Sequence, residues 1–584
     1  MTLGEPDYII DPLFYTFLDS AVYWAEELQI HLIIDNHTFD PAVDTKPDIE
    51  DVLLKVWPQV ANHYKNTSQY IYYEVLNEPH GIADNIWNNI QQNVIDAIRE
   101  IDTTHFIVVG PANWNGYNNL KNLPEYTDDK LIYTFHFYDP FLFTHQGATW
   151  NTPSMGPLKD VPFPYHADSM PDFPSELDNT WVENSFNNYA NDGTEAKVKE
   201  LIDIAVQFKN SRNVPMLCGE FGVFIPNSPR SGRLDWYELV SDYLEEKGIA
   251  WTIWDYTGSF GIFETGGNDI FEYDIDTALV SKLGLTVPEQ QEFVKQPDTV
   301  GIIIYNDFIG EKISESSNAA NGIIDLYNQL GPNNGLRCIK WSEGNQYASI
   351  GFDFKPNKDL TNLRGENYAL DMMVRGNTSG SKLDIRFLDT KTTAAEDHPW
   401  RVRYTIDNNL VTWDRSWQHI HIPLTSFTEQ GSWDNDTWFN PIGAFDWTEI
   451  DRFEIVAEHH NLSGRIFYFD NIHITNQDTA IVYDTSKYSN SNAYTTSNDV
   501  LVYPNPAIDN ITFSYKNVAQ EDVELKIFDI SGRELYSGIY KNWTSTILWD
   551  CKTNQREKIQ SGVYFYRLAV GNSINKGKVL ISDR

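Results

Sequence analysis

Two glutamates stand where predicted β-strands end, and residues of this type can carry out acid–base and nucleophilic chemistry. Glu78 follows the run IYYEV within the motif NEP, and Glu220 lies in the motif GEFG. Because the carboxyl ends of the strands form the rim of a parallel α/β barrel, carboxylates from different strands can converge there. A pair held about 5–5.5 Å apart can cleave a glycosidic bond with retention: one group protonates the leaving oxygen and the other attacks the anomeric carbon. We expect Glu74, earlier in the same strand, to lie below the rim.

The elements that must position these carboxylates alternate along the first half of the chain. Short apolar, β-branched runs are separated by amphipathic helical stretches from residue 11 to about residue 290, a pattern typical of βα units around a parallel sheet. The connection from Tyr138 to about Thr194 is rich in Pro, Phe, Trp and Asp, so we expect it to form a wall of a binding cleft. The predicted strands are residues 31–35, 71–75, 106–110, 131–137, 214–221 and 249–254.

The pattern changes in the second half. Residues 300–475 contain short alternating runs separated by Gly, Asn and Asp, which predicts an antiparallel β-sandwich of the jelly-roll kind. Residues 476–499 are polar and low in aliphatic side chains, as expected of a linker, and residues 500–584 form a further small all-β module. We therefore expect a barrel domain over residues 1–290 followed by two β-domains.

Four motifs of the first half resemble glycoside hydrolase family 5. NEP at 77–79, HFY at 136–138, GEFG at 219–222 and WTIWDY at 251–256 look like that family's motifs, and their order and spacing are more specific than any one of them. The resemblance covers residues 1 to about 290 and implies a (β/α)8 TIM-type barrel. It also implies that Glu78 is the general acid/base on the fourth strand and Glu220 the nucleophile on the seventh.

The resemblance implies roles for the side chains around this pair. Asn77 would bind the sugar's 2-hydroxyl, a contact that strengthens as positive charge grows on the ring. His37 would line the subsite beside the scissile bond, and Trp254 would be the stacking platform under the distorted sugar. Of the two residues that share a face of the strand at 131–137 and its end, Tyr138 would orient the nucleophile and His136 would sit near the acid.

Two residues of the long connection, His145 and Trp150 in FTHQGATW, are predicted to belong to the cleft wall.

If Glu78 follows the fourth strand, the strand at 31–35 is the third and that at 249–254 the eighth. We therefore expect this chain to lack the first two strands of the barrel and, with them, the family's arginine. Closure needs all eight strands, since edge strands expose unpaired backbone groups. Two further βα units and an export signal are expected upstream of Met1.

The C-terminal module carries VLVYPNPAIDNITFSY, LKIFDISGRELY, SGVYFYRL and KGKVLIS in that order. This combination resembles the C-terminal sorting domain of type IX secretion, which implies recognition by an outer-membrane secretion machinery and a secreted or surface-attached protein. The sandwich ends in YFDNIHI, which is similar to carbohydrate-binding jelly rolls of glycanases. Such a module would raise the enzyme's effective concentration at an insoluble substrate. A purely structural spacer is the alternative.

The composition of the chain indicates which classes of partner and cofactor are disfavoured. With 43 Lys and Arg against 83 Asp and Glu, the net charge of −40 disfavours nucleic acids and anionic lipids, and no apolar run is long enough to form a transmembrane segment. The three cysteines are far apart, which implies neither a disulfide framework nor a metal site. His419 and His421 place two imidazoles on one strand face, but a third ligand is not evident. We therefore expect no metal and no cofactor.

These features predict a retaining endo-β-1,4-glycanase, foremost a cellulase that hydrolyses a β-glucan. A β-mannanase or xyloglucanase of the same family is an alternative. A non-catalytic polysaccharide-binding protein is another, and an inverting hydrolase is a third that differs in the anomer first released.

Overall fold

A computed structural model describes residues 8–477, apart from 38–42, 330, 334, 336, 393 and 395, together with segments between residues 500 and 581. The expected linker at 476–499 lies outside the described residues from position 478 onward. The chain forms two compact units, Met1–Glu292 and Phe293–Arg584. The C-terminal segments described are 500–503, 511–515, 523–528, 533–540, 546–555, 557–560, 562–570 and 573–581.

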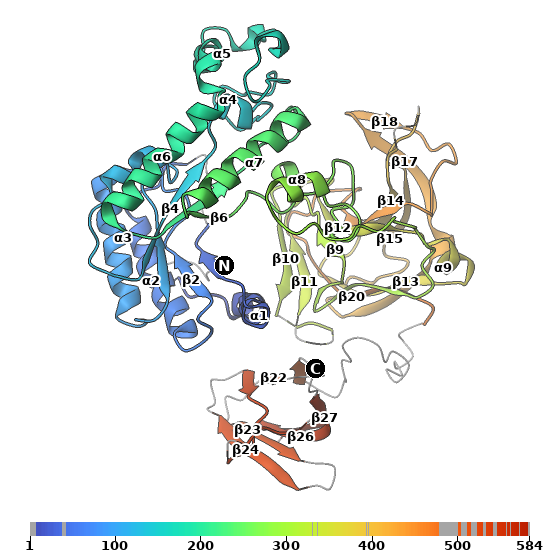
Figure 1. Ribbon diagram of the computed structural model, residues 1–584. Helices are drawn as coiled ribbons and strands as arrows, with labels where there is room; N and C mark the ends of the chain where they lie inside the picture. Colours follow the sequence, from blue (N-terminus) through green and yellow to red (C-terminus); the bar gives the residue numbers. More distant parts are fainter. Residues whose placement is uncertain are drawn as a thin grey trace. The chain divides into compact units, whose positions relative to one another are not determined.

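The first unit is built on one six-stranded sheet, all parallel and in chain order (Figure 1). Each strand except the last is followed by a helix or a long connection, so the predicted α/β class, a curled TIM-like half-barrel, is confirmed. The predicted strand at 249–254 pairs regularly only at Ala250–Trp251, although Trp254 N still donates to Phe221 O at 2.9 Å. The strands are β1 (Leu32–Asp35), β2 (Ile71–Glu74), β3 (Phe106–Val109), β4 (Leu131–Phe137), β5 (Met216–Phe221) and β6 (Ala250–Trp251).

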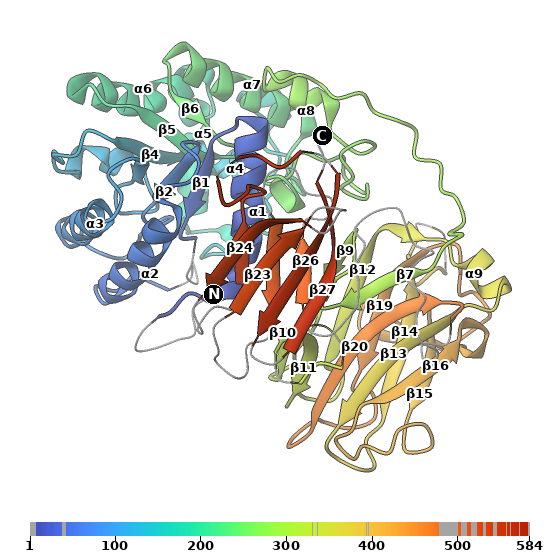
Figure 2. The ribbon, with the colours of Figure 1, turned by 90° about the horizontal axis from the view of Figure 1, so that it is seen from below.

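Helices flank this sheet (Figures 1 and 2). Among the described residues, the helices are all too short or too polar to cross a bilayer. The α-helices are α1 (Pro12–Leu28), α2 (Ile49–Tyr64), α3 (Asp84–Arg99), α4 (Phe141–Thr144), α5 (Trp181–Asp192), α6 (Glu195–Arg212), α7 (Arg230–Glu246) and α8 (Thr277–Lys282). The 3-10 helices are η1 (Tyr117–Asn122), η2 (Ala167–Ser169), η3 (Ser175–Leu177) and η4 (Gly258–Phe260).

Three fully buried tryptophans tie the helices to the strand ends. Trp57 of α2 donates its indole N–H to the carbonyl of Val75 at 2.9 Å, directly after β2. Trp87 of α3 does the same for Gly110 after β3, and Trp236 of α7 for Asp139 shortly after β4. Because a buried carbonyl without a partner is costly, these bonds stabilise the chain where it leaves the sheet toward the rim. Part of the tryptophan content therefore belongs to the core.

The apolar face expected on the first helix is only partly buried. Val22 and Ala25 of α1 are buried, while Phe17, Trp24 and Leu28 stay exposed. The helix itself begins as its residues dictate, since the Asp11 side chain accepts from Leu13 N and Pro12 occupies the first turn. The apolar period thus predicts the helix correctly, but it does not predict which of its side chains are covered.

The second unit begins with a β-sandwich of two mainly antiparallel, seven-stranded sheets around one apolar core, which confirms the predicted fold class. Its short helices are α9 (Thr361–Gly365) and η5 (Leu424–Ser426). One sheet contains β7 (Ile302–Asn306), β8 (Phe308–Ile309), β10 (Ile323–Asn328), β11 (Cys338–Ser342), β13 (Ala369–Gly376), β16 (Gln418–Pro423) and β20 (Ile466–Thr475). The other contains β9 (Ile313–Glu315), β12 (Ser349–Lys358), β14 (Leu383–Asp389), β15 (Arg401–Ile406), β17 (Thr428–Asp434), β18 (Thr437–Phe439) and β19 (Ile450–Val456).

The C-terminal module has a separate apolar core and two antiparallel sheets of three and four strands. The small C-terminal β-domain expected from the sequence is therefore present. The three-stranded sheet consists of β21 (Val500–Tyr503), β22 (Ile511–Tyr515) and β25 (Thr546–Trp549). The four-stranded sheet consists of β23 (Val523–Phe528), β24 (Glu534–Tyr540), β26 (Gly562–Val570) and β27 (Ser573–Ile581).

Candidate active site

The two glutamates of the motifs meet at the carboxyl ends of the parallel strands. Glu78 lies four residues beyond β2, and Glu220 is the penultimate residue of β5. A carboxylate oxygen of each and a ring nitrogen of His136 all lie within 4.8 Å of one another. The two carboxylates, 142 positions apart in the chain, are therefore brought together at one place on the rim.

His136 lies between the two carboxylates. Its Nδ1 donates to Glu78 Oε1 at 2.7 Å and lies 3.4 Å from Glu220 Oε2. Burial would lower the pKa of His136, but the charges of Glu220 and Glu78 and the hydrogen bond outweigh burial and raise the pKa to about 9. The imidazole is therefore a cation at neutral pH, and its charge favours the ionised form of Glu220.

Glu220 accepts a second hydrogen bond, from the hydroxyl of Tyr138 at 2.8 Å. Burial raises the pKa of Glu220, and the Glu78 charge raises it further, whereas His136 and the Tyr138 hydroxyl lower it. The net direction is upward. Tyr138 and His136 thus counteract the cost of holding a charged Glu220 carboxylate away from water.

Glu74, the rival carboxylate, is buried at the end of β2. Burial and the nearby Asp35 raise the pKa of Glu74 to about 8, so this side chain is mainly protonated at neutral pH. The expectation that it lies below the rim agrees with this position.

Two glycines of GEFG allow the close approach of backbones beside Glu220. The register of β4 against β5 shifts between Phe135 and His136, so that Gly219 has no directly opposite partner. A Cβ on Gly219 would lie 2.5 Å from Thr134 Oγ1, and one on Gly222 would lie 2.2 Å from the carbonyl oxygen of Trp254. Both contacts exclude a larger residue, so the two glycines are needed for the packing around Glu220.

The backbone at Glu78 is strained. Its φ of +46° lies in the left-handed region, which residues other than glycine seldom adopt. The conformation follows the tight turn between Asn77 and Pro79 and is held by bonds around it, since Asn77 N donates to Asn36 O and His80 Nδ1 contacts Glu78 O at 2.9 Å. Strain of this kind is often found at sites that must aim a side chain.

His37, Asn77 and Trp254 form a second group at the rim. His37 Nδ1 donates to the carboxylate of Asp35 at 2.8 Å, and this hydrogen bond raises the pKa of His37. Asn77 Nδ2 donates to His37 Nε2 at 3.2 Å. The indole of Trp254 stacks on the His37 ring, with ring centres 5.4 Å apart and planes 7° from parallel. Asp35 therefore fixes the ring orientation on which both other residues depend.

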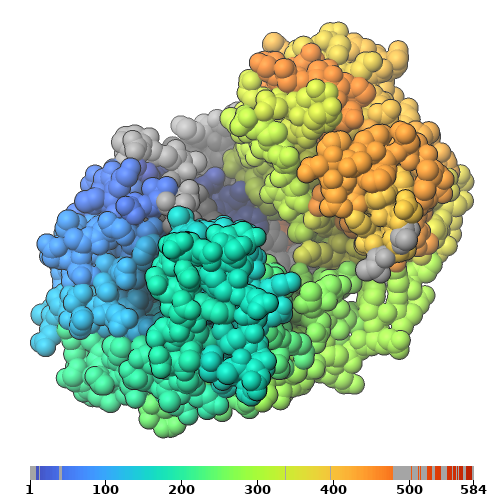
Figure 3. Space-filling view, turned by 90° about the horizontal axis from the view of Figure 1, so that it is seen from above, coloured from blue at the N-terminus to red at the C-terminus, as the bar shows by residue number. Residues whose placement is uncertain are grey.

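The long connection after β4 brings aromatic residues next to Tyr138. His145 packs edge-on against Tyr138, is stacked by Phe141 and is buried, which lowers the pKa of His145 to about 3 and keeps the ring neutral. Trp150 is 57% exposed and leans against Phe224. Residues of this segment, coloured teal, project on the face shown in Figure 3. Of the two predicted wall residues, Trp150 can present a ring to a ligand, whereas His145 supports Tyr138 from behind.

The predicted set omits an aromatic pair near Glu78. Trp114 follows β3, is 46% exposed and stacks on His80 with ring centres 4.6 Å apart. His80 in turn contacts the Glu78 carbonyl. The sequence signal was a tryptophan in PANWNG immediately after a predicted strand, and three successive positive φ angles at Asn113, Trp114 and Asn115 project that turn outward.

A metal is not needed to explain the Glu78–His136–Glu220 cluster. The ligand atoms are close enough for one ion. A protonated imidazole has no free lone pair on either nitrogen, so a metal would have to displace the proton of His136. The three groups are also suited to proton transfer and nucleophilic attack.

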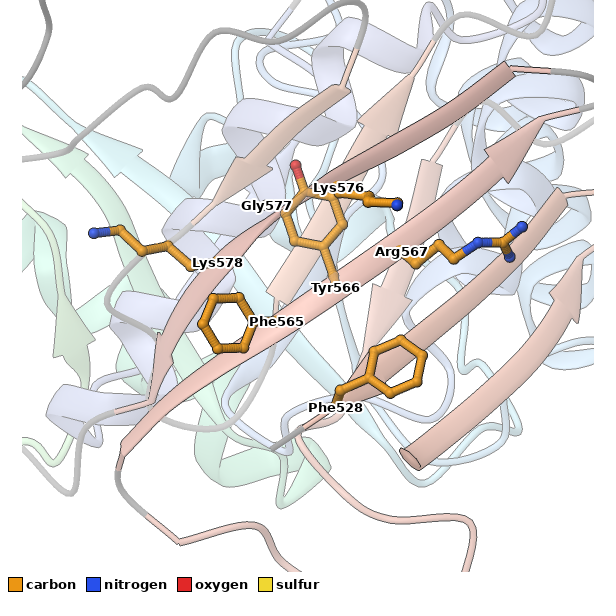
Figure 4. Close-up of a pocket in the computed structure, with 7 residues that line it drawn as sticks. All are labelled: Phe528, Phe565, Tyr566, Arg567, Lys576, Gly577 and Lys578. Carbon is orange, nitrogen blue, oxygen red and sulfur yellow. The ribbon is translucent and has the colours of Figure 1, made fainter. Parts of the chain in front are cut away.

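A depression in the C-terminal module lies in a different part of the chain from the carboxylates. It is lined by side chains of β23, β26 and β27, and Figure 4 shows the rings of Phe528 and Phe565 beside the cations of Arg567 and Lys578. Without a paired carboxylate or nucleophile it offers no hydrolytic chemistry.

Comparison with known protein families finds matches to three separate segments of the chain. Residues 1–259 match the family model of cellulase, glycosyl hydrolase family 5. This part of the chain is therefore similar to family 5 catalytic domains. Residues 316–476 match carbohydrate binding domain 30, and residues 501–582 match the secretion system C-terminal sorting domain. The sorting domain together with the family 5 domain indicates a secreted or cell-surface protein.

Curated relatives of the family 5 domain are named endoglucanases. Endoglucanase 3 of Fibrobacter succinogenes is 31% identical over 270 residues, which are 44% of this chain and 41% of that protein. Endoglucanase C of Acetivibrio thermocellus is 29% identical over 250 residues, 41% of this chain and 72% of that protein. The chain thus spans less than half the length of the first of these relatives.

Solved structures that match part of the chain include an endoglucanase at 25% identity and a TM-score of 0.40, covering 48% of this chain and 82% of that one. Endoglucanase Cel5A from Thermotoga maritima is 24% identical with a TM-score of 0.40, covering 48% of this chain and 81% of that one.

Proposed function

We propose that the chain is a retaining endo-β-1,4-glucanase that hydrolyses a cellulose-like β-glucan without a cofactor. One observation carries this proposal: Glu78 and Glu220 converge within 4.8 Å, with His136 between them, at the strand ends of a family 5 domain. In the proposed reaction Glu78 protonates the leaving glycosidic oxygen while Glu220 attacks the anomeric carbon. Glu78 then removes a proton from the water that releases the covalent intermediate.

The remaining residues at the rim have roles that follow from their contacts. The Tyr138 hydroxyl and the His136 cation stabilise the Glu220 carboxylate before attack. Asn77 would hydrogen-bond the sugar's 2-hydroxyl, and Trp254, stacked on His37, would carry a sugar ring. Trp114 offers a further stacking surface near Glu78, where the leaving part of the glucan would lie.

The proposal is tested with carboxymethylcellulose, by reducing-end release together with viscosity. Replacing the nucleophile (Glu220→Gln) or the acid (Glu78→Gln) is expected to lower kcat by about a thousandfold or more. Glu176→Gln, an equal charge change at an exposed position of η3, serves as the matched control and should keep wild-type turnover. Equal turnover by wild type and Glu220→Gln would refute the nucleophile assignment.

Two alternatives are separated by further measurements. A β-mannanase or xyloglucanase would hydrolyse mannan or xyloglucan faster than β-glucan in a parallel panel. NMR of the first product identifies the anomer: the β-anomer supports retention, and the α-anomer would support an inverting hydrolase instead. If the full chain binds cellulose but hydrolyses no glycan, the function is better explained as that of a non-catalytic polysaccharide-binding protein.

A further inference from the structure

A cluster of two histidines and an aspartate lies on the outer face of the β-sandwich. Asp371 of β13 is directly opposite His421 of β16, and His419 stands two positions earlier on β16. The residues that alternate with them, Leu370, Met372, Ile420 and Ile422, point into the apolar core. Since side chains alternate between the faces of a strand, the three polar side chains share the opposite face.

The three side chains converge on one point. Asp371 Oδ2 lies 2.7 Å from His419 Nε2 and 2.9 Å from His421 Nδ1, and the ligand atoms of all three lie within 4.8 Å of one another. The Asp371 side chain is almost wholly buried, at 1% exposure, whereas those of His419 and His421 are 21% and 28% exposed. A buried carboxylate at the base and two partly open imidazoles above it leave one side accessible to solvent.

The environment supplies a fourth nitrogen nearby. His473 of β20 is directly opposite Asp371 on the other side of β13, so it belongs to the same row of side chains. Figure 2 shows β20, β13 and β16 running side by side.

We propose that Asp371, His419 and His421 bind a divalent transition-metal ion, zinc in the first place. Two imidazole nitrogens and one carboxylate oxygen form a mixed donor set of the kind that zinc takes, whereas calcium and magnesium prefer oxygen ligands alone. Three protein ligands leave a fourth position for water or for a group supplied from outside. The sequence alone left this site out because its third ligand lies 48 and 50 positions from the two histidines.

The ion would hold the edge of the sheet. β16 is the terminal strand of its sheet and pairs only with β13 among the described strands. An ion bound by one residue of β13 and two of β16 would therefore cross-link the edge strand to the sheet interior. It would also block one face of an edge that could otherwise separate or pair with another chain. The site is distinct from the carboxylates of the family 5 domain.

The test is zinc binding by the full chain after treatment with EDTA, measured by isothermal titration at pH 7.5 with ZnCl2 and, in parallel, CaCl2. The expected result is one zinc ion bound per chain at this site with a micromolar or tighter Kd, and no calcium. His421→Gln and His419→Gln should each weaken zinc binding by about tenfold or more. Zinc should raise the Tm of the wild type, and the same zinc concentration should raise the Tm of both variants by less.

The controls separate this site from other histidine–carboxylate pairs. His459→Gln removes a histidine that pairs with Asp384 at 2.8 Å in the other sheet of the same sandwich, and it should bind zinc as the wild type does. His136→Gln reports on the only other cluster of this kind among the described residues. Absence of zinc binding, or binding that survives His421→Gln and is lost in His136→Gln, would overturn the proposal. Both β16 variants are made at partly exposed positions, and an unchanged Tm in EDTA shows that they fold.

Discussion

At the scale of single residues, the chemistry of the site depends on how charge is balanced around Glu220. Burial raises the pKa of this carboxyl, and the Tyr138 hydroxyl and the His136 cation oppose that rise. An attacking carboxylate must be ionised, so any loss of these two partners reduces the reactive fraction at acidic pH. Replacing Tyr138 or His136 would therefore change the pKa of Glu220 without altering the carboxylate itself.

The Tyr138→Phe variant tests this balance. It removes the hydrogen bond that lowers the pKa of Glu220, so that pKa rises and the acidic limb of the kcat profile shifts to higher pH. A bond to a charged acceptor contributes about 1.5–3 kcal/mol, so kcat is expected to fall by about 10–100-fold at pH 6, with a small change in KM. The pH–rate profile on carboxymethylcellulose provides the measurement. A lower kcat with an unshifted acidic limb would contradict this role.

At the scale of elements, the site depends on the irregular pairing of β4 with β5. The register shift at Gly219 lets His136 lie opposite Glu220, two residues that a regular pairing would have displaced by one position. The three buried tryptophans of α2, α3 and α7 stabilise the strand ends from the other side. The rim is therefore held by contacts that are themselves remote from the substrate.

Gly219→Ala should disturb this pairing. The new methyl would lie 2.5 Å from Thr134 Oγ1, inside a fully buried contact, and 3.3 Å from His136 Nε2. Overpacking of this kind costs about 1–3 kcal/mol of folding free energy, and kcat should fall because His136 is displaced. Thermal unfolding and kcat provide the measurements. Adding Thr134→Ala removes the opposing oxygen and should recover most of the lost Tm, whereas a wild-type Tm in Gly219→Ala alone would speak against the tight contact.

At the scale of the whole molecule, the chain joins a segment that matches family 5 cellulases to one that matches carbohydrate binding domain 30. Among the tryptophans of the sandwich, Trp400 and Trp413 are buried, Trp417 is partly buried, and Trp433 and Trp438 are 54% and 41% exposed. Trp433 and Trp438 stand opposite each other on the β17–β18 hairpin. Exposed rings of this kind are suited to stacking on the apolar faces of sugars.

Removing these two rings should separate binding from catalysis. Trp433→Ala and Trp438→Ala are expected to lower retention of the full chain on insoluble cellulose several-fold and to leave kcat on soluble carboxymethylcellulose unchanged, because a tethered module acts through effective concentration. Tyr347→Ala, at another exposed aromatic position of the same domain, serves as the control. Unchanged retention in both tryptophan variants would place the binding surface elsewhere on the sandwich.

The sequence by itself determined the local structure and most of the candidate site. The runs at 31–35, 71–75, 106–110 and 131–137 correspond to β1 to β4, because apolar period and β-branched composition act within a few residues. The motifs NEP and GEFG placed Glu78 and Glu220 at strand ends, where the structure has them, and their resemblance to family 5 suggested the roles of the two residues. They could not indicate how far apart the two carboxylates lie.

Only the tertiary structure decided which distant residues meet. Trp114 and His80 stack after two different strands, and Asp371 reaches His419 and His421 because β13 and β16 pair in one register. Such contacts depend on strand pairing and side-chain packing across the core, for which no local period exists. The same cause explains why Phe17, Trp24 and Leu28 follow the expected helical period but are not buried: burial depends on what packs against an element, not on the element's own sequence.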